Sequence, residues 1–208
     1  MVQRVKHFSF LLFLGGWIVA VAFGFWFSAS YEKGAAAEKN VASWPPGLSV
    51  TLDRSRENLI LVAHPRCPCT DATLDELISI MTRCREGLRV SVLFTVPAVK
   101  EAGWTDSDLE RAARRIPGVT VIDDLDGRMA ARLGATTSGE VLLFDGAGRL
   151  LFSGGITGAR GHAGWNEGEA AVIELASSPV PRISSVRHAP VFGCSLVGAG
   201  GDEKGKGL

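Results

Sequence analysis

A charge-free apolar run near the N-terminus divides this chain into two unlike parts. The sequence from Phe8 to Phe27 is FSFLLFLGGWIVAVAFGFWF, which contains no acidic or basic side chain. A helix of about 20 residues, rising about 1.5 Å per residue, matches the hydrocarbon core of a bilayer, which is roughly 30 Å thick. We therefore expect one transmembrane helix over residues 8–29, preceded by a short segment at residues 1–7.

The charges around this run indicate which side of the membrane each part occupies. Arg4 and Lys6 precede the run, and basic residues tend to stay on the cytoplasmic side. We therefore expect residues 1–7 in the cytoplasm and the rest of a single-pass protein on the extracytoplasmic (periplasmic) side. A cleaved signal peptide is the alternative, since small residues at 28–30 and 35–37 offer cleavage sites, but the run is longer than the usual stretch of about 7 to 15 apolar residues. Both destinations permit disulfides.

The composition beyond the anchor changes several times, and these changes indicate the domain boundaries. A small and charged stretch ends at Pro45-Pro46, and the chain finishes in GAGGDEKGKGL. The predicted parts are a linker at 30–47, a globular domain at 48–178, a C-terminal segment docking on that domain at 179–197, and a disordered tail at 198–208. The 22 basic and 22 acidic residues balance, which argues against a nucleic-acid partner.

The globular part alternates between buried strands and amphipathic helices. Aliphatic runs predict strands at 58–64, 88–96 and 119–122, each followed by a helix, and then a hairpin at 140–154 and a last helix at 166–177. Strands that alternate with helices form parallel pairs, and the hairpin adds antiparallel strands. The sequence therefore predicts an α/β fold with a central mixed sheet flanked by helices.

Two of the four cysteines lie in HPRCPCT, residues 64–70, between the first strand and the first helix. A cysteine at a helix N-terminus faces unpaired N–H groups, which lower its pKa and favour the reactive thiolate. His64 and Arg66 could add positive charge beside Cys67 and Cys69. A cysteine pair at this place in such an order of elements resembles the thioredoxin fold.

The spacing of the pair is unusual, because only Pro68 separates Cys67 from Cys69. Residues two apart point away from each other on a regular helix, so a disulfide between them needs non-helical backbone. Such a small ring should be strained and easily reduced. The loop is expected to be exposed, which favours an exchanging pair over thiols that merely pack or form a fixed bridge.

Cys84 is expected to differ from the pair. It continues an apolar stripe on the first helix, and we interpret it as a buried core thiol. The other members of the stripe are Leu74, Leu77, Ile78 and Met81.

Three motifs together resemble the RedB-type family of membrane-anchored thioredoxin-like proteins. They are HPRCPCT, TSGEVLLFDGAGRLLFSGGITGARGH and PVFGC, and the resemblance covers roughly residues 44–196. It implies a thiol-redox role but supplies no substrate. Cys67 and Cys69 correspond to the redox pair that the family implies, whereas His64, His162 and Cys194 match recurrent motifs without an assigned role.

One position departs from ordinary thioredoxins, which place a cis-proline before the hairpin. Here that place holds Ser138-Gly139. A glycine leaves space for a close approach by a substrate, a metal or the chain's own tail. The apolar segment RHAPVFGCSL at 187–196 is expected to dock near Gly139 and to bring Cys194 toward the pair.

The first functional hypothesis is a thiol–disulfide oxidoreductase that needs no cofactor. In this hypothesis a Cys67 thiolate attacks a disulfide of a partner protein of unknown identity, and Cys69 or Cys194 resolves the mixed disulfide. A peroxidase-like thiol enzyme is a weaker option, because no motif distinguishes it.

The second hypothesis is a metal-binding module, similar to the Sco-type copper proteins. Soft thiolates with imidazole would favour copper or zinc. Arg160 and His162, in the glycine-rich stretch 154–168, are candidates for reaching the cysteine loop. The candidate metal ligands are His64, Cys67 and Cys69 with Cys194, His162 or His188.

Overall fold

The computed structural model divides the chain into two units, residues 1–34 and 35–208. The residues that it describes are 2–32, 41–97, 106–177 and 185–196. The first unit consists of helix α1 (Val2–Glu32), and its stretch Phe10–Ser28 is long and apolar enough to cross a membrane. This agrees with the expectation of one N-terminal helix that could anchor the chain.

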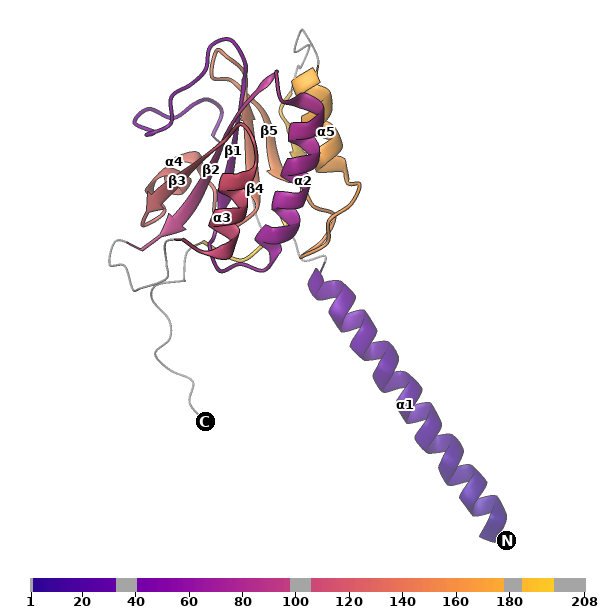
Figure 1. The fold of residues 1–208 in the computed structure, drawn as a ribbon. Coiled ribbons are helices and arrows are strands. Elements are labelled where there is room, and N and C mark those ends of the chain that lie inside the picture. Colours follow the sequence, from indigo (N-terminus) through magenta and orange to yellow (C-terminus); the bar gives the residue numbers. More distant parts are fainter. Residues whose placement is uncertain (1, 33–40, 98–105, 178–184, 197–208) are drawn as a thin grey trace. The chain divides into compact units, whose positions relative to one another are not determined.

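The second unit is built on a six-stranded sheet in the order β3-β2-β1-β4-β5-β6 (Figure 1). Strand β1 lies in the centre, parallel to β2 and antiparallel to β4. The outer pairs are β2 with β3 and β5 with β6, both parallel, and the hairpin β4–β5 is antiparallel. The strands are β1 (Glu57–Ala63), β2 (Leu88–Val96), β3 (Val119–Leu125), β4 (Glu140–Phe144), β5 (Leu150–Gly155) and β6 (Arg187–Ala189).

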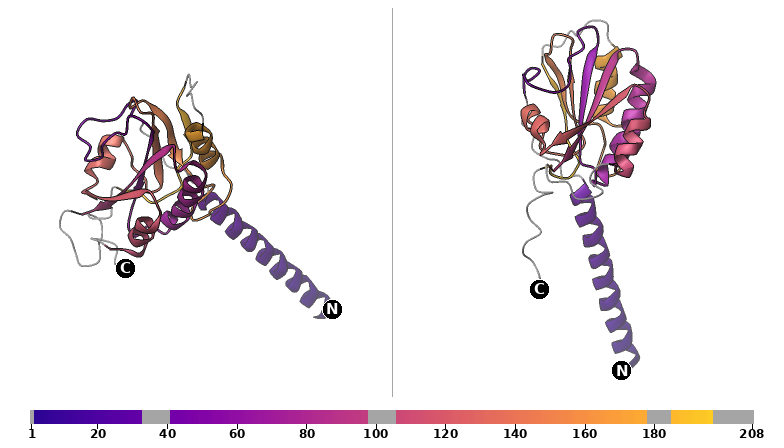
Figure 2. Two further views of the ribbon diagram at one scale, coloured as in Figure 1. Left: turned by 45° about the horizontal axis from the view of Figure 1, so that its top comes forward. Right: turned by 60° about the vertical axis from the view of Figure 1, so that its left-hand side comes forward.

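Helices cover both faces of the sheet. Figure 2 shows α2, α3 and α5 on one face and the short α4 on the other. Their bounds are α2 (Cys69–Cys84), α3 (Asp108–Arg115), α4 (Arg128–Leu133) and α5 (Glu167–Ser177). The unit β1–α2–β2 followed by β4–β5–α5 is the thioredoxin-like arrangement, so the predicted fold class is confirmed.

The central strand explains how one sheet supports two apolar cores. Successive side chains of a strand point to opposite faces. Leu59, Leu61 and Ala63 therefore belong to the core under α2, α3 and α5, whereas Ile60 and Val62 belong to the core under α4. All five are nearly inaccessible to solvent, as expected of a strand covered on both sides. This burial fixes the end of β1, where the cysteine loop begins.

Helix α2 carries the apolar stripe that the sequence predicts, with one error. Leu74, Leu77, Met81 and Cys84 are buried as expected. Ile78 is 46% exposed, and Ile80 takes its place in the core. Position 80 lies one helical turn after Leu77, so it shares the inner face of the helix, whereas position 78 turns outward.

The domain begins earlier than the predicted linker boundary at residue 47. The Trp44 ring packs edge-on against Phe144, with the ring centroids 5.2 Å apart. The Trp44 N–H donates a hydrogen bond to the Gly148 carbonyl at 2.7 Å. Residues 41–47 therefore belong to the domain, because an aromatic side chain within the expected linker finds an apolar partner on the hairpin.

The C-terminal segment, residues 185–196, returns to the sheet through β6. This strand approaches β5 so closely that a side chain on Gly154 would overlap the Ala189 backbone. Beyond β6 the chain reaches the loop that precedes β4. The expected tail at 198–208 lies outside the described residues.

Candidate functional site

The cysteine loop is a tight turn between β1 and α2. The Cys67 N–H donates to the His64 carbonyl at 3.2 Å, and the Thr70 N–H donates to the Cys67 carbonyl at 3.0 Å. Pro68 occupies the N-cap position of α2, and Cys69 is its first residue. Proline fits there because a helix start has no use for its missing N–H. Cys67 is thus fixed just outside the helix.

The pair is buried, so the expectation of an exposed loop is wrong. Cys67 is 1% and Cys69 is 9% exposed, while the neighbouring Arg66 and Pro68 face solvent. Distant parts of the chain contact both sulfur atoms, since Cys194 lies against Cys67 and the Gly161 N–H bonds to Cys69. Residues 191–196, here called the covering segment, lie over the loop.

Main-chain hydrogen bonds hold the covering segment on the loop before β4. The Ser138 N–H donates to the Cys194 carbonyl at 2.8 Å, and the Leu196 N–H donates to the Thr136 carbonyl at 2.8 Å. The two stretches run antiparallel, as a short extra strand pair. The segment therefore docks beside Gly139, at the place that the sequence analysis expected.

Two glycines make this close approach possible. A side chain on Gly193 would overlap the Ser138 carbonyl. Gly139 has a φ of +92°, and a Cβ there would lie 3.1 Å from the Thr73 hydroxyl. Residues with side chains rarely adopt this φ. Glycine is therefore required on both sides of the contact.

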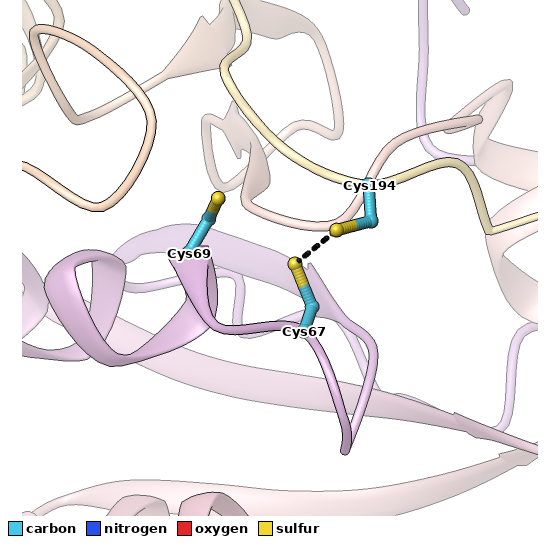
Figure 3. Close-up of side chains that lie close together, drawn as sticks. All are labelled: Cys67, Cys69 and Cys194. Atoms are coloured by element: carbon cyan, nitrogen blue, oxygen red, sulfur yellow. Dashed lines mark hydrogen bonds between the residues drawn. The ribbon is translucent and has the colours of Figure 1, made fainter. Parts of the chain in front are cut away.

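The docked segment brings three thiols together (Figure 3). The Sγ atoms of Cys67 and Cys194 lie 3.0 Å apart and point toward each other. With the Cys69 Sγ they form a group in which all sulfur atoms lie within 4.8 Å of one another. All are free thiols.

The surroundings of Cys67 favour its thiolate. Burial by itself would raise the pKa of Cys67, but hydrogen bonds to the sulfur outweigh that effect. The strongest are made with the thiol and backbone N–H of Cys194. The Cys69 N–H and the Ser138 hydroxyl contribute further bonds, and the pKa of Cys67 falls below its ordinary value.

The other two thiols are held in the protonated form. Burial and the charge of Cys67 raise the pKa of Cys69. Burial, the hydrogen bond with Cys67 and the charges of Cys67 and Cys69 raise the pKa of Cys194 to about 12. Arg160 opposes both shifts with its positive charge. Its guanidinium also donates to the Gly193 carbonyl, so Arg160 does reach the cysteine site.

His64 does not supply the positive charge that the sequence suggested. Burial, and then the charge of Arg66, lower the pKa of His64, which favours the neutral ring. Its Nδ1 accepts a hydrogen bond from the Arg66 N–H at 3.2 Å. The remaining candidates, His162 and His188, are exposed.

The set of possible metal ligands is therefore smaller than the sequence suggested. Among the described residues, the cluster of ligating side chains consists of Cys67, Cys69 and Cys194, without a histidine. Three thiolates could hold a soft ion such as copper(I) or zinc. The imidazole ligands of the metal hypothesis are not part of this cluster.

Sequence reasoning missed the role of the Ser138 hydroxyl. It accepts a hydrogen bond from the His64 N–H at 2.9 Å and lies 3.0 Å from the Thr70 hydroxyl oxygen. The same hydroxyl bonds to the Cys67 sulfur. The only signal was its place, directly before the glycine that replaces the expected proline.

Comparison with known proteins supports the fold and gives no activity. No family model and no curated protein matches the chain. The hypothetical protein SMc02350 of Sinorhizobium meliloti 1021 is similar in structure, with 18% identity, coverage of 78% of this chain and 97% of that one, and a TM-score of 0.57. An uncharacterized conserved protein of Geobacillus kaustophilus gives 16% identity, 79% and 90% coverage, and a TM-score of 0.53.

A looser similarity is to a secreted disulfide oxidoreductase of Mycobacterium tuberculosis. It has 15% identity, coverage of 48% of this chain and 68% of that one, and a TM-score of 0.38. A TM-score this low is not evidence about the activity of the present chain. The cysteine site is the feature of this chain that bears on its function.

Proposed function

We propose that this chain is a membrane-anchored, extracytoplasmic thiol–disulfide oxidoreductase whose exchanging couple is Cys67 and Cys194. The observation that carries the proposal is the 3.0 Å approach of their sulfur atoms, across 127 residues of sequence. The thioredoxin-like fold, with Cys67 just before α2, supports it. The resemblance of the three motifs to the RedB-type family points to the same kind of chemistry.

The couple is Cys67 with Cys194 rather than Cys67 with Cys69. A disulfide needs sulfur atoms about 2.05 Å apart, so the first pair has to close by only about 1 Å. Cys69 already has helical backbone as the first residue of α2. Joining it to Cys67 would require that turn of the helix to unwind.

The exchange proceeds in two balanced steps. The Cys67 thiolate attacks one sulfur of the partner disulfide, which forms a mixed disulfide and releases a thiolate that takes up a proton. The Cys194 thiolate then attacks the Cys67 sulfur, the mixed bond breaks, and the second partner thiolate leaves and is protonated. Two electrons and two protons pass to the partner. The reverse sequence oxidises a partner dithiol.

The first step prepares Cys194 for the second. Burial makes the largest contribution to the pKa of Cys194, about 12, and the hydrogen bond with Cys67 and the charge of Cys67 raise it further. The two contributions of Cys67 vanish once Cys67 carries the mixed disulfide. The pKa of Cys194 then falls, with Arg160 favouring its thiolate. In the docked arrangement the resolving thiol is thus suppressed as long as Cys67 is a free thiolate.

Trapping the mixed disulfide tests the proposal. Reduced full-length Cys194→Ser protein is exposed to a disulfide-containing peptide and analysed without reduction. We expect a stable adduct on Cys67, because the second step is blocked. Cys67→Ser should give no such adduct at Cys69 or Cys194, and Cys84→Ser should behave as wild type. Adducts spread equally over all the thiols would contradict an activated Cys67.

The location proposed for the domain has a separate test. Arg4 and Lys6 before the apolar helix support an extracytoplasmic domain. A reporter enzyme that works only in the cytoplasm, fused after Leu208, should be inactive. Activity of this fusion would place the cysteines in a reducing compartment and remove the setting for a stable disulfide.

A second candidate function is soft-metal binding by the same three thiols. The observation in its favour is that their sulfur atoms lie within 4.8 Å of one another. Metal analysis of the purified chain, with a thiol count before and after chelation, separates the two. About one equivalent of copper or zinc, released with the appearance of reactive thiols, would favour the metal module.

A further inference from the structure

We propose that the covering segment is a built-in mimic of the partner: it occupies the surface on which an extended, cysteine-bearing segment of the partner protein docks, and that partner segment carries glycine directly before its cysteine. This inference rests on the proposed exchange at Cys67. It adds the kind of partner and a competition between that partner and the chain's own residues 191–196.

The covering segment is held by contacts that another chain could make. Two of its hydrogen bonds to Thr136 and Ser138 involve only main-chain groups of Cys194 and Leu196. Main-chain pairing of this kind accepts any extended segment, whatever its side chains. The pairing also sets the register, and in that register the cysteine faces Cys67.

Selectivity comes from the position before the cysteine. The Ser138 carbonyl lies so close to Gly193 that a Cβ there would overlap it. A partner segment in the same register meets the same carbonyl. Only glycine fits at that position without moving the loop before β4.

The flanking positions indicate an apolar partner segment. Val191 is 1%, Phe192 is 9% and Leu196 is 8% exposed. Leu196 belongs to the core beneath α4. A segment that replaced this one with polar residues would leave apolar surface uncovered, so the best-fitting partner sequence is apolar, then glycine and cysteine, then an apolar residue two positions later.

The covering segment must leave before a partner can react. Cys67 is only 1% exposed beneath it, so a partner sulfur cannot reach the thiolate while the segment is docked. Arg160 stabilises the docked segment, because its guanidinium donates a hydrogen bond to the Gly193 carbonyl. When the segment returns, it brings Cys194 to the mixed disulfide and displaces the partner from the same surface. Resolution of the mixed disulfide and release of the partner therefore occur together.

The first test opens the cover in the full chain. Gly193→Ala should increase the rate of Cys67 alkylation in the reduced protein about 10-fold or more, as for a fall of about 1.4 kcal/mol in the free energy of opening. Gly158→Ala is the matched control, since its added Cβ would lie 3.8 Å from the Asn166 side chain, an ordinary contact. Arg160→Gln, which adds nothing to the interface, should act in the same direction. Unchanged rates in Gly193→Ala and Arg160→Gln would overturn the proposal.

The second test measures selectivity with two peptides on the Gly193→Ala protein. The peptides VFGCSL and VFACSL each carry their cysteine as a mixed disulfide with glutathione, and oxidised glutathione alone is the control. We expect the glycine peptide to transfer to Cys67 about 10-fold faster than the alanine peptide. Equal rates would overturn the docking surface while leaving the exchange function intact. No transfer from any of the three reagents would instead refute the proposed function.

Discussion

The two ends of helix α2 carry cysteines that are almost equally buried but chemically different. Cys67, just before the helix, is 1% exposed, and Cys84, its last residue, is 6% exposed. Cys84 lies in the core with the Ser177 hydroxyl 3.4 Å from its sulfur. Cys67 instead meets N–H groups, a hydroxyl and two other thiols. Burial alone therefore does not distinguish a reactive thiol from a structural one.

The covers of the two thiols differ as well. Helix α5 lies over Cys84 and is anchored in the core by Val172 and Leu175. The covering segment over Cys67 is held by a few main-chain bonds, by the three-residue strand β6 and by the buried side chain of Leu196 at the edge of the core under α4. Elements with few core contacts open at low cost. The proposed exchange therefore requires that the cover of Cys67 opens, whereas nothing in it requires the cover of Cys84 to open.

The largest difference between the two ends is expected in stability after oxidation. A Cys67–Cys194 disulfide closes a loop of 127 residues. The lost entropy of the unfolded chain should then stabilise the folded state by about 5 kcal/mol. Denaturant unfolding of the purified oxidised and reduced protein should show an increase of that order in the free energy of unfolding on oxidation. Cys84→Ser should keep the gain, and Cys194→Ser should lose it. Equal stabilities before and after oxidation would mean that the C-terminal segment is not bonded to the loop.

The next largest difference is expected in turnover. Cys194→Ser should slow disulfide exchange on the order of 100-fold or more, because resolution then requires an external thiol instead of one held in place. Cys84→Ser should change the rate by less than twofold, or about 0.4 kcal/mol. An assay that follows reduction of a peptide disulfide measures both variants. A strong effect of Cys84→Ser would break the division between the two ends.

In the reduced chain we expect the opposite order, with a larger loss of stability from substituting Cys84 than from substituting Cys194. Cys84→Ala should lower the free energy of unfolding by about 1 kcal/mol, since it removes a sulfur from packed core. Cys194→Ala should cost less, because Cys194 is only partly buried. Urea unfolding under reducing conditions ranks the two. A larger cost for Cys194 would show that the covering segment is as firmly fixed as α5.

The smallest expected effect concerns the pH at which Cys67 reacts. Its pKa is lowered by hydrogen bonds, so chelator-treated protein should show an alkylation midpoint for Cys67 below about 8.5. Ser138→Ala removes one donor to the thiolate and should move this midpoint upward by less than about 1 unit. Ser177→Ala, the equivalent change beside Cys84, should leave it in place. A midpoint at or above the ordinary value would remove the proposed activation.

The order of strands and helices could be predicted from the sequence, because periodic apolar residues report local structure. The stripe that contains Leu77 and Cys84 is an example, and its one error, Ile78, lies two positions from the residue that replaces it. The docking of Cys194 near Gly139 could also be predicted from the sequence. An apolar tail and a glycine in place of proline suggested it together.

The chemistry of the loop was harder to predict, since it depends on residues far away in the sequence. The HPRCPCT motif looks exposed because nothing local covers it, and the cover comes from residues 191–196. The same burial makes His64 a neutral ring instead of a positive charge. The Ser138 hydroxyl could not be assigned to Cys67 before β1 and the loop preceding β4 were placed side by side.

Peptide mapping without reduction tests the central claim most directly. Reduced full-length protein is mildly oxidised, its remaining thiols are blocked, and the digest is searched for linked cysteines. We expect a single linkage between Cys67 and Cys194, with Cys84 blocked as a free thiol. A linkage confined to Cys67 and Cys69, or one that includes Cys84, would contradict it.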